Sequence, residues 1–100
     1  MVKIVVLYGP PSDPGAFEEH YAKTHLPLAA KIPNVKRFEA SRVVATPDGS
    51  DPPFYRIAEL WFDSEAEMQT ATSSPEGQAT VADIAGFATG GATVLIAAVD

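Results

Sequence analysis

A chain of 100 residues with 46% hydrophobic content is typical of one globular domain, which we assign to residues 1–100. Thirteen acidic residues against seven basic ones give a net charge of −6, which argues against partners such as nucleic acids or anionic membranes. The chain has no cysteine, so disulfides and thiolate-bound metals are excluded. The apolar start is too short for a membrane span or a signal peptide, and we expect a cytoplasmic protein.

The first predicted strand covers residues 2–8, VKIVVLY, and stops at the breaker Gly9-Pro10-Pro11. Its alternate residues are apolar on both faces, which is typical of a strand at the centre of a sheet.

A helical segment over residues 14–32 follows, with Asp13 as N-cap and Pro14 at the first position. Apolar and aromatic residues recur on one stripe of this helix at helical spacing, namely Phe17, Tyr21, His25, Leu28 and Ile32. Because Leu26 precedes Pro27, we expect a kink or a stop just after His25. An imidazole on the buried stripe, where the helix breaks, is the strongest functional clue in the sequence. His20 lies off the stripe, and we expect it in solvent.

Two further strands are predicted over residues 35–46 and 54–62, joined by a proline-rich loop over residues 47–53. On the later strand, Ala58, Leu60 and Phe62 would share one face. The other face would carry the residues Tyr55, Ile57, Glu59 and Trp61.

The remaining segments are two helices and a strand. Ser64 to Glu67 fits a capping box, and Ser74-Pro75 starts the second helix. A stripe on that helix consists of Val81, Ile84, Ala85 and Ala88, with Phe87 beside it. Gly90-Gly91 would end the helix, and residues 92–99 form an apolar last strand.

The order of elements is β-α-β-β-α-β, which predicts an α+β ferredoxin-like fold. Helices on one face leave the other face of the sheet bare, and its aromatic and apolar side chains are too many for a stable monomer. We therefore expect a homodimer in which two sheets pack face to face as a dimeric α+β barrel.

Two segments carry a family resemblance. YAKTHLPLAAKIPNVKRFE (residues 21–39) resembles the His-x-Pro-Leu region of dimeric α+β-barrel proteins, and SSPEGQATVADIAGFATGG (residues 73–91) is similar to the signature of the EthD family. That family is named after an ethyl tert-butyl ether degradation cluster, and its fungal relatives act as decarboxylases or dehydratases on aromatic polyketides. The fold is also shared with cofactor-free monooxygenases and haem-binding barrels. The resemblance implies that His25 is the family histidine.

Two roles for His25 remain open. It can be a general acid or base that lines a pocket between helix and sheet, because imidazole titrates near neutral pH. Alternatively, it is a structural residue whose ring nitrogens bond backbone carbonyls freed at Pro27. A metal pair of His20 and His25 is rejected, because residues five apart point to different sides of an α-helix. We expect neither a metal nor a cofactor.

Further candidates surround this histidine. Tyr21 would orient a substrate, and the expected substrate contacts are Phe17, Leu28, Phe87 and Trp61. For Phe17, Tyr21 and Phe87, packing in the core is the better explanation. Glu59 inside the barrel would need a partner, for which Arg37 or Arg42 is placed on the neighbouring strand.

These residues lead to two functional hypotheses. The first is a cofactor-independent oxidoreductase, or a decarboxylase or dehydratase, that uses His25 on a hydrophobic or aromatic small molecule. The second is a non-catalytic protein that binds or carries such a molecule. A second polar residue converging on His25 would favour chemistry over binding.

Overall fold

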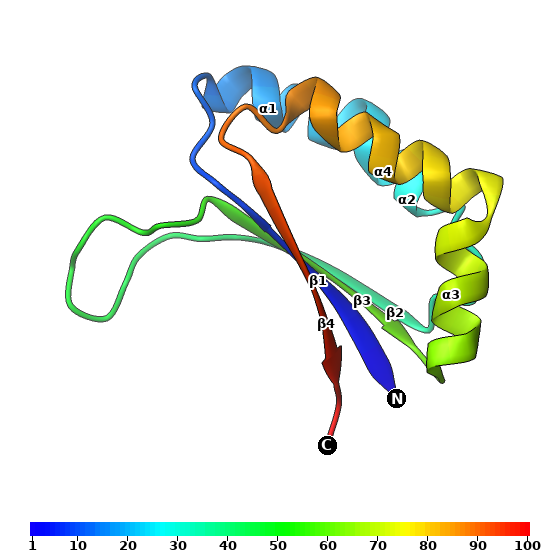
Figure 1. Ribbon diagram of the computed structural model, residues 1–100. Coiled ribbons are helices and arrows are strands. Elements are labelled where there is room, and N and C mark those ends of the chain that lie inside the picture. Colours follow the sequence, from blue (N-terminus) through cyan, green and yellow to red (C-terminus); the bar gives the residue numbers. More distant parts are fainter.

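Four antiparallel strands form one sheet in the order β2-β3-β1-β4, and every helix lies on the same face of it, in the computed structural model that describes residues 1–100 (Figure 1). The strands are β1 (Val2–Tyr8), β2 (Arg37–Arg42), β3 (Arg56–Phe62) and β4 (Ala92–Ala98). The helical segments are α1 (Pro14–His20), the π-helical turn η1 (Tyr21–His25), α2 (Leu26–Ala29), α3 (Glu65–Ser73) and α4 (Pro75–Phe87). The predicted α+β ferredoxin-like order is confirmed.

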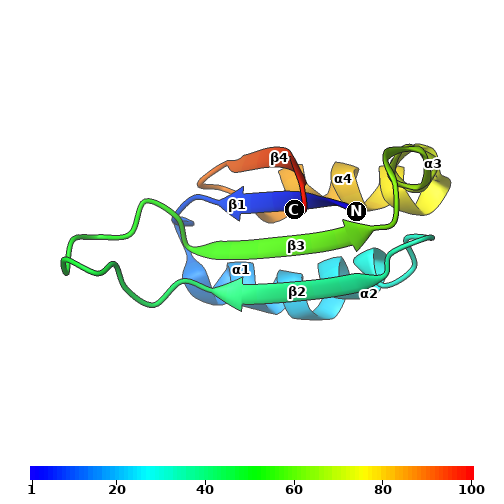
Figure 2. The same cartoon turned by 90° about the horizontal axis from the view of Figure 1, so that it is seen from below.

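β1 is one of the two inner strands, as its two apolar faces predicted, and it pairs with β3 on one side and β4 on the other (Figure 2). Val6 lies opposite Ala58 of β3 and Val94 of β4. Because side chains alternate along a strand, even-numbered positions of these three strands point toward the helices and odd-numbered ones toward the uncovered face. Val6, Tyr8 and Ala58 are accordingly buried.

The uncovered face carries charges among its apolar residues. Glu59 pairs with Lys3 at 3.0 Å, so the expected partners Arg37 and Arg42 are wrong for this carboxylate. Lys3 and Arg37 lie over the ring of Trp61, at 5.2 Å and 5.0 Å from its centroid. The placement of Tyr55 on this face is also wrong.

Tyr55 precedes β3 and packs edge-on against Phe17 of α1 at 5.2 Å, on the helix side of the sheet. The two strands around it are shorter than predicted. Beyond the regular β2–β3 pairing, single backbone bonds join Val43 to Tyr55 and Lys36 to Trp61. The chain between residues 43 and 55 then leaves the sheet, and the loop over residues 47–53 projects from the rest of the molecule, exposed except for the half-buried Pro52 (Figure 1).

The first helix does not stop after His25. Asp13 caps it as predicted, because its carboxylate accepts a hydrogen bond from the amide of Ala16 at 3.1 Å. The chain then stays helical to Ala29, with Pro27 in the first turn of α2. The strain of the proline is absorbed by the π turn, in which the amide of Leu26 bonds the carbonyl of Tyr21 five residues back.

The two later helices begin where the sequence predicted. The hydroxyl of Ser64 accepts from the amide of Glu67 at 3.2 Å, and that of Ser74 accepts from Gly77 at 3.0 Å. The predicted inward stripe on α4 is partly confirmed and partly rotated: Ile84 and Ala88 pack against the core, whereas Ala85 is exposed and Val81, at the cavity wall, is 62% exposed. The buried residues of α4 are Gly77, Thr80 and Phe87.

The helix α4 ends at Phe87, three residues before the predicted glycine cap. Gly91 instead supplies a turn with φ of 86° that leads into β4. None of the helices is long and apolar enough to cross a membrane.

Candidate functional site

An apolar cavity of about 360 Å³ lies between the helices and the sheet. Its size falls at the lower end of the range for small-molecule sites, roughly 300–1,000 Å³. Most of its walls are aliphatic or aromatic, from β1, β3, β4, α2 and α4. The polar side chains that reach it are those of Tyr8, Tyr21, His25, Thr72 and Thr80. A cavity therefore reaches His25.

His25 is only 5% exposed and makes two side-chain hydrogen bonds. Its Nδ1 lies 3.0 Å from Oδ2 of Asp83 on α4, and its Nε2 lies 3.3 Å from the hydroxyl of Tyr8 at the end of β1. The structural role proposed for His25 required its ring nitrogens to bond backbone carbonyls freed at Pro27. Neither nitrogen makes such a bond. Two polar side chains thus converge on the imidazole, from a strand and from a helix distant in the sequence.

The charges of this pair follow from burial and from their mutual contact. Burial lowers the pKa of His25, and the hydrogen bond and charge of Asp83 oppose this only in part. Burial pushes the pKa of Asp83 upward, but the hydrogen bonds and charges of His20 and His25 outweigh it, so the pKa lies below its ordinary value. At neutral pH, Asp83 is a carboxylate and His25 a neutral ring. Because a carboxylate only accepts, the ring donates from Nδ1 and keeps the lone pair of Nε2 on the Tyr8 side.

Two tyrosine hydroxyls complete the polar side of the site. Burial raises the pKa of Tyr8 and of Tyr21, so both keep their protons at neutral pH. The Tyr8 hydroxyl donates to His25, whereas the buried Tyr21 hydroxyl has no hydrogen-bond partner. Arg56 lies over the Tyr21 ring at 4.5 Å from its centroid and is fixed by two hydrogen bonds to Glu18, at 2.8 Å and 2.9 Å. The Tyr21 hydroxyl thus lies buried beside the Arg56 guanidinium, whose charge and hydrogen bonding oppose the effect of burial on the pKa of Tyr21.

His20 was expected in solvent because it lies off the stripe, but its side chain also bonds Asp83. Its Nε2 lies 2.9 Å and 3.0 Å from the two oxygens of Asp83, and a third of its side chain (33%) is exposed. In an α-helix, residues five apart would point about 140° from each other. The π turn spans five residues per hydrogen bond, which brings His20 and His25 to the same carboxylate. Even so, no group of three His, Asp or Glu side chains is arranged to hold a metal ion.

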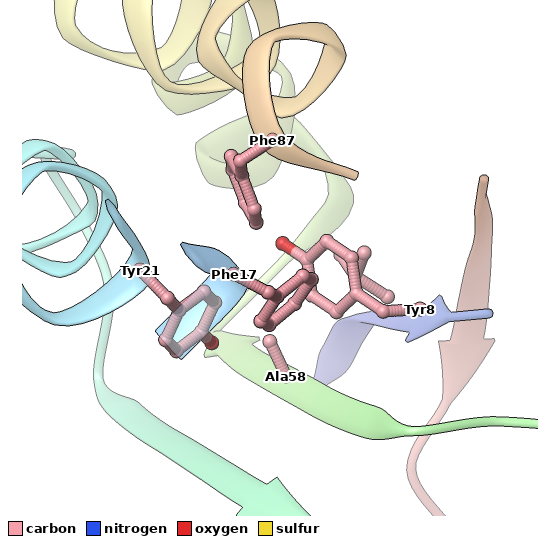
Figure 3. Packing of buried hydrophobic residues seen from close by; sticks show 6 residues of the cluster. Tyr8, Phe17, Tyr21, Ala58 and Phe87 are labelled. Carbon is pink, nitrogen blue, oxygen red and sulfur yellow. The ribbon is translucent and has the colours of Figure 1, made fainter. Parts of the chain in front are cut away.

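The residues proposed from the sequence are divided among three places. Tyr21 and His25 line the cavity. Phe17 and Phe87 are buried beside them and pack on Tyr8 at 5.4 Å and 5.7 Å, so they form the aromatic support of the site (Figure 3). Leu28 is half-buried outside the cavity lining, and Trp61 lies on the uncovered face of the sheet.

Two residues of the site were missed from the sequence, Tyr8 and Asp83. Tyr8 looked like the last residue of a core strand, and it is indeed 1% exposed. The signal for Asp83 was a single acidic residue inside the apolar segment VADIAGF, one turn before Phe87. A lone carboxylate near the inner stripe of a helix calls for a partner.

Comparison with known proteins gives a consistent picture. The family model described as EthD domain matches residues 9–91. An uncharacterized 11.0 kDa protein from the thcB-thcC intergenic region of Rhodococcus erythropolis is 47% identical over 95 residues, which cover 95% of this chain and 91% of that protein. The crystal structure of an ethyl tert-butyl ether degradation family protein from Bacillus halodurans is similar with a TM-score of 0.94 and 37% identity, over 100% of this chain and 99% of that one.

More distant structures share the fold alone. SnoaB from Streptomyces nogalater, a cofactor-independent oxygenase, matches with a TM-score of 0.69 at 15% identity, over 98% of this chain and 91% of its own. Several other matched proteins with a ferredoxin-like fold are described as dimeric.

Proposed function

Because the chain belongs to the EthD family and its cavity is bordered by the buried Tyr8 and His25, with Asp83 bonded to the far side of the imidazole, we propose that it is an acid–base enzyme acting on a small hydrophobic molecule. The observation that carries this proposal is the pair of hydrogen bonds that fixes both ring nitrogens of His25. A protein that only binds an apolar ligand has no need of a carboxylate directed at a buried imidazole.

His25 acts as the base through its Nε2. The ring is neutral before reaction, so its lone pair is available, and Asp83 stabilises the imidazolium that forms when a proton is taken up. The 3.3 Å contact with Tyr8 is long for a hydrogen bond to a hydroxyl, and a substrate displaces it at low cost. The reacting C–H or O–H group of the substrate then takes the position next to Nε2 of His25 that the Tyr8 hydroxyl has in the free protein.

The hydroxyls of Tyr8 and Tyr21 define the class of substrate. Both remain protonated and donate to an oxygen that gains negative charge as His25 removes a proton. The rest of the cavity offers aliphatic and aromatic contact and no cation. We therefore infer a neutral, ring-containing substrate with one or two carbonyl or phenol oxygens, held by Tyr21 and deprotonated by His25.

Removal of a proton next to a carbonyl is a step shared by several reactions. The enolate that results can react with dioxygen, as in a cofactor-independent oxidoreductase, or lose hydroxide in a dehydration. The same enolate is the product of a decarboxylation, and His25 returns a proton to it. The acid–base equipment of this site serves each of these, and the leaving group of the substrate selects among them.

We also propose that the enzyme is a homodimer. The face of the sheet away from the helices is not covered by this chain, and it carries Val5, Leu7, Ile57 and Leu95, of which Leu95 is 50% exposed. A two-fold pairing of these faces would bury the same apolar residues on both copies at once.

The test uses 2-tetralone, a neutral bicyclic ketone with weakly acidic hydrogens beside its carbonyl. In D₂O, proton NMR follows the replacement of these hydrogens by deuterium in the presence of the protein. We expect the rate above buffer to fall at least about a hundredfold in His25→Asn, which keeps an amide near Asp83 but cannot take up a proton. Tyr21→Phe is expected to weaken binding of the ketone.

Lys23→Gln serves as the matched control. Lys23 is exposed on the same helix and contacts only Glu19 at 3.1 Å, so exchange should match that of the unaltered protein. If the protein binds 2-tetralone yet accelerates no exchange, the acid–base proposal fails and the chain is a carrier. If His25→Asn exchanges as fast as the unaltered protein, another group is the base.

A further inference from the structure

One carboxylate serves two histidines that lie on different sides of the helix layer. Asp83 accepts from His25 through Oδ2, and both of its oxygens lie within 3.0 Å of Nε2 of His20. The side chain of Asp83 is 15% exposed and that of His25 only 6%, whereas that of His20 is 33% exposed. Exposure therefore rises along the series from His25 to His20.

The two imidazoles face different spaces. His25 lines the apolar cavity, whereas His20 is absent from that lining. His20 instead borders a recess on the outer surface of the helices, which it shares with Ser12, Asp13 and Thr89. Asp83 thus forms a polar bridge through the layer made by the first helix and α4.

We propose that Asp83 and His20 form a proton path that connects His25 to bulk water. The path rests on the proposed function, because it supplies what the base at His25 needs: an exit for the proton when a ligand fills the cavity. The cavity wall around His25 is mostly aliphatic, and its other polar side chains are the hydroxyls of Tyr8, Tyr21, Thr72 and Thr80, none of which takes up a proton near neutral pH. The hydrogen bonds from His25 and His20 to Asp83 provide another route for the proton, through the helix layer.

Each transfer along the path conserves its proton. His25 takes up a proton at Nε2 and passes the one on Nδ1 to Oδ2 of Asp83. At rest His20 donates from Nε2 to the carboxylate. Once Asp83 is protonated, the ring of His20, a third of whose side chain is exposed, exchanges its Nε2 proton with water and takes up the tautomer with its proton on Nδ1, so that Nε2 accepts the carboxyl proton. His20 then releases the Nδ1 proton to water, and Asp83 is again a carboxylate.

The charged groups around the path are compatible with this direction. Asp13, across the surface recess, adds negative charge near His20. Lys23 is neutralised locally by Glu19. On the inner side, the only neighbouring ionisable groups of His25 are the tyrosine hydroxyls and Asp83, since Arg56 is occupied by Glu18.

His20 also has a packing role that the test must separate from proton transfer. Its ring stacks on Phe87, with centroids 5.0 Å apart and planes at 22°. His20→Gln keeps an amide near the position of Nε2 and loses the second ring nitrogen. His20→Phe keeps the stacked ring and loses both nitrogens.

The experiment measures exchange of the buried Nδ1 proton of His25 with water, by NMR on protein labelled with ¹⁵N-histidine and without any substrate. We expect exchange to slow by about tenfold or more in His20→Gln and His20→Phe, because proton transfer through the carboxylate then has no acceptor. Asp83→Asn, which accepts a hydrogen bond but carries no proton, should slow it as well. Lys23→Gln, on the surface next to His20, should leave it unchanged.

The outcomes separate the path from the proposed function. Unchanged exchange in His20→Gln and His20→Phe, with native spectra elsewhere, overturns the path and leaves His25 as a base that exchanges through the cavity. Slowed exchange in a protein that fails to act on 2-tetralone supports the path and contradicts the enzyme. If His20→Gln disturbs the packing on Phe87, His20→Phe still decides the question.

Discussion

Asp83 and His25 are 58 positions apart in the sequence, yet a carboxylate oxygen of the first lies 3.0 Å from Nδ1 of the second. The contact depends on the angle at which α4 crosses the π turn η1. It fixes the tautomer of the imidazole, and with it the position of the only basic lone pair on the cavity wall. A carboxylate that orients a buried imidazole also raises its basicity, against the effect of burial.

The first prediction concerns the charge of Asp83. In Asp83→Asn, the hydrogen bond and the negative charge that raise the pKa of His25 are weakened, so burial should lower that pKa further. NMR titration of the His25 ring would measure this shift. Exchange of 2-tetralone hydrogens should fall about a hundredfold, since the imidazolium loses its counter-charge. Asp63→Asn is the control, because its carboxylate is 55% exposed and faces only Lys36. An unchanged His25 titration would contradict the prediction.

The second prediction concerns the loop over residues 47–53. Its contacts are internal: the carboxylate of Asp48 accepts from the hydroxyls of Thr46 and Ser50, which hold its pKa at about 2. Because the loop covers no part of the core, its replacement by a two-residue Asn-Gly turn should leave the melting temperature nearly unchanged. Differential scanning calorimetry would check this. A loss of several degrees would mean that the loop contacts a second copy of the chain.

The fold could be predicted because its signals are local. A few adjacent residues are enough to indicate each of these features: the strand over residues 2–8, the caps at Asp13, Ser64 and Ser74, and the order of elements. The rotation of α4 was not predictable in this way. It accompanies a close approach of α3 and α4 at Gly77, where an added Cβ would clash with the backbone carbonyl of Ala71, and no local pattern in the sequence indicates this contact.

The site was half predictable. His25 and Tyr21 were found from helical spacing, because both lie on the buried stripe. The role of Asp83 required the crossing of two helices, and that of His20 required a π turn, which no spacing rule for α-helices contains. The π turn directly precedes Pro27, so the sequence predicts the place of the irregularity and not its geometry.

The third prediction compares two glycines of α4. Gly77→Ala should destabilise the fold by about 1–3 kcal/mol or more, because the added methyl meets the backbone of Ala71 and Thr72. Gly86→Ala should stabilise it by about 0.5–1 kcal/mol, since that position is helical, exposed and open. Urea unfolding of the two variants measures both signs. Equal effects would mean that the close contact of α3 with α4 is not tight in solution.

The fourth prediction concerns assembly. Size-exclusion chromatography with light scattering should give about twice the chain mass of 10.6 kDa. Leu95→Lys places a charge on the uncovered sheet face and should produce a monomer, because an unpaired buried charge opposes association. Val44→Lys is the matched control, since that valine is 86% exposed and lies outside the sheet. A monomeric unaltered protein at micromolar concentration would contradict the dimer.

The last prediction concerns pH and stability, and its sign follows from His25. The pKa of this group is lower in the folded chain than its ordinary value of 6.5, so the unfolded chain takes up a proton first as the pH falls. The stabilisation is fully present above pH 6.5 and is lost as the pH falls from there to the folded pKa, by at most about 1.4 kcal/mol per pH unit.

Asp83 acts in the same direction at lower pH. Its pKa lies below the ordinary 3.8 in the fold, so its contribution disappears only as the pH falls below that value. The contributions of the two groups to stability can therefore be separated by the pH ranges in which they are lost.

Urea unfolding at several pH values between 7.5 and 5, at one protein concentration, should show the loss of unfolding free energy that belongs to His25. In His25→Asn, this loss should be smaller, although the variant starts less stable because the buried Tyr8 hydroxyl has lost its acceptor. An unaltered protein whose free energy of unfolding stays constant from pH 7.5 to 5 would mean that His25 is not buried as a neutral ring, and the base at the cavity wall would have to be sought elsewhere.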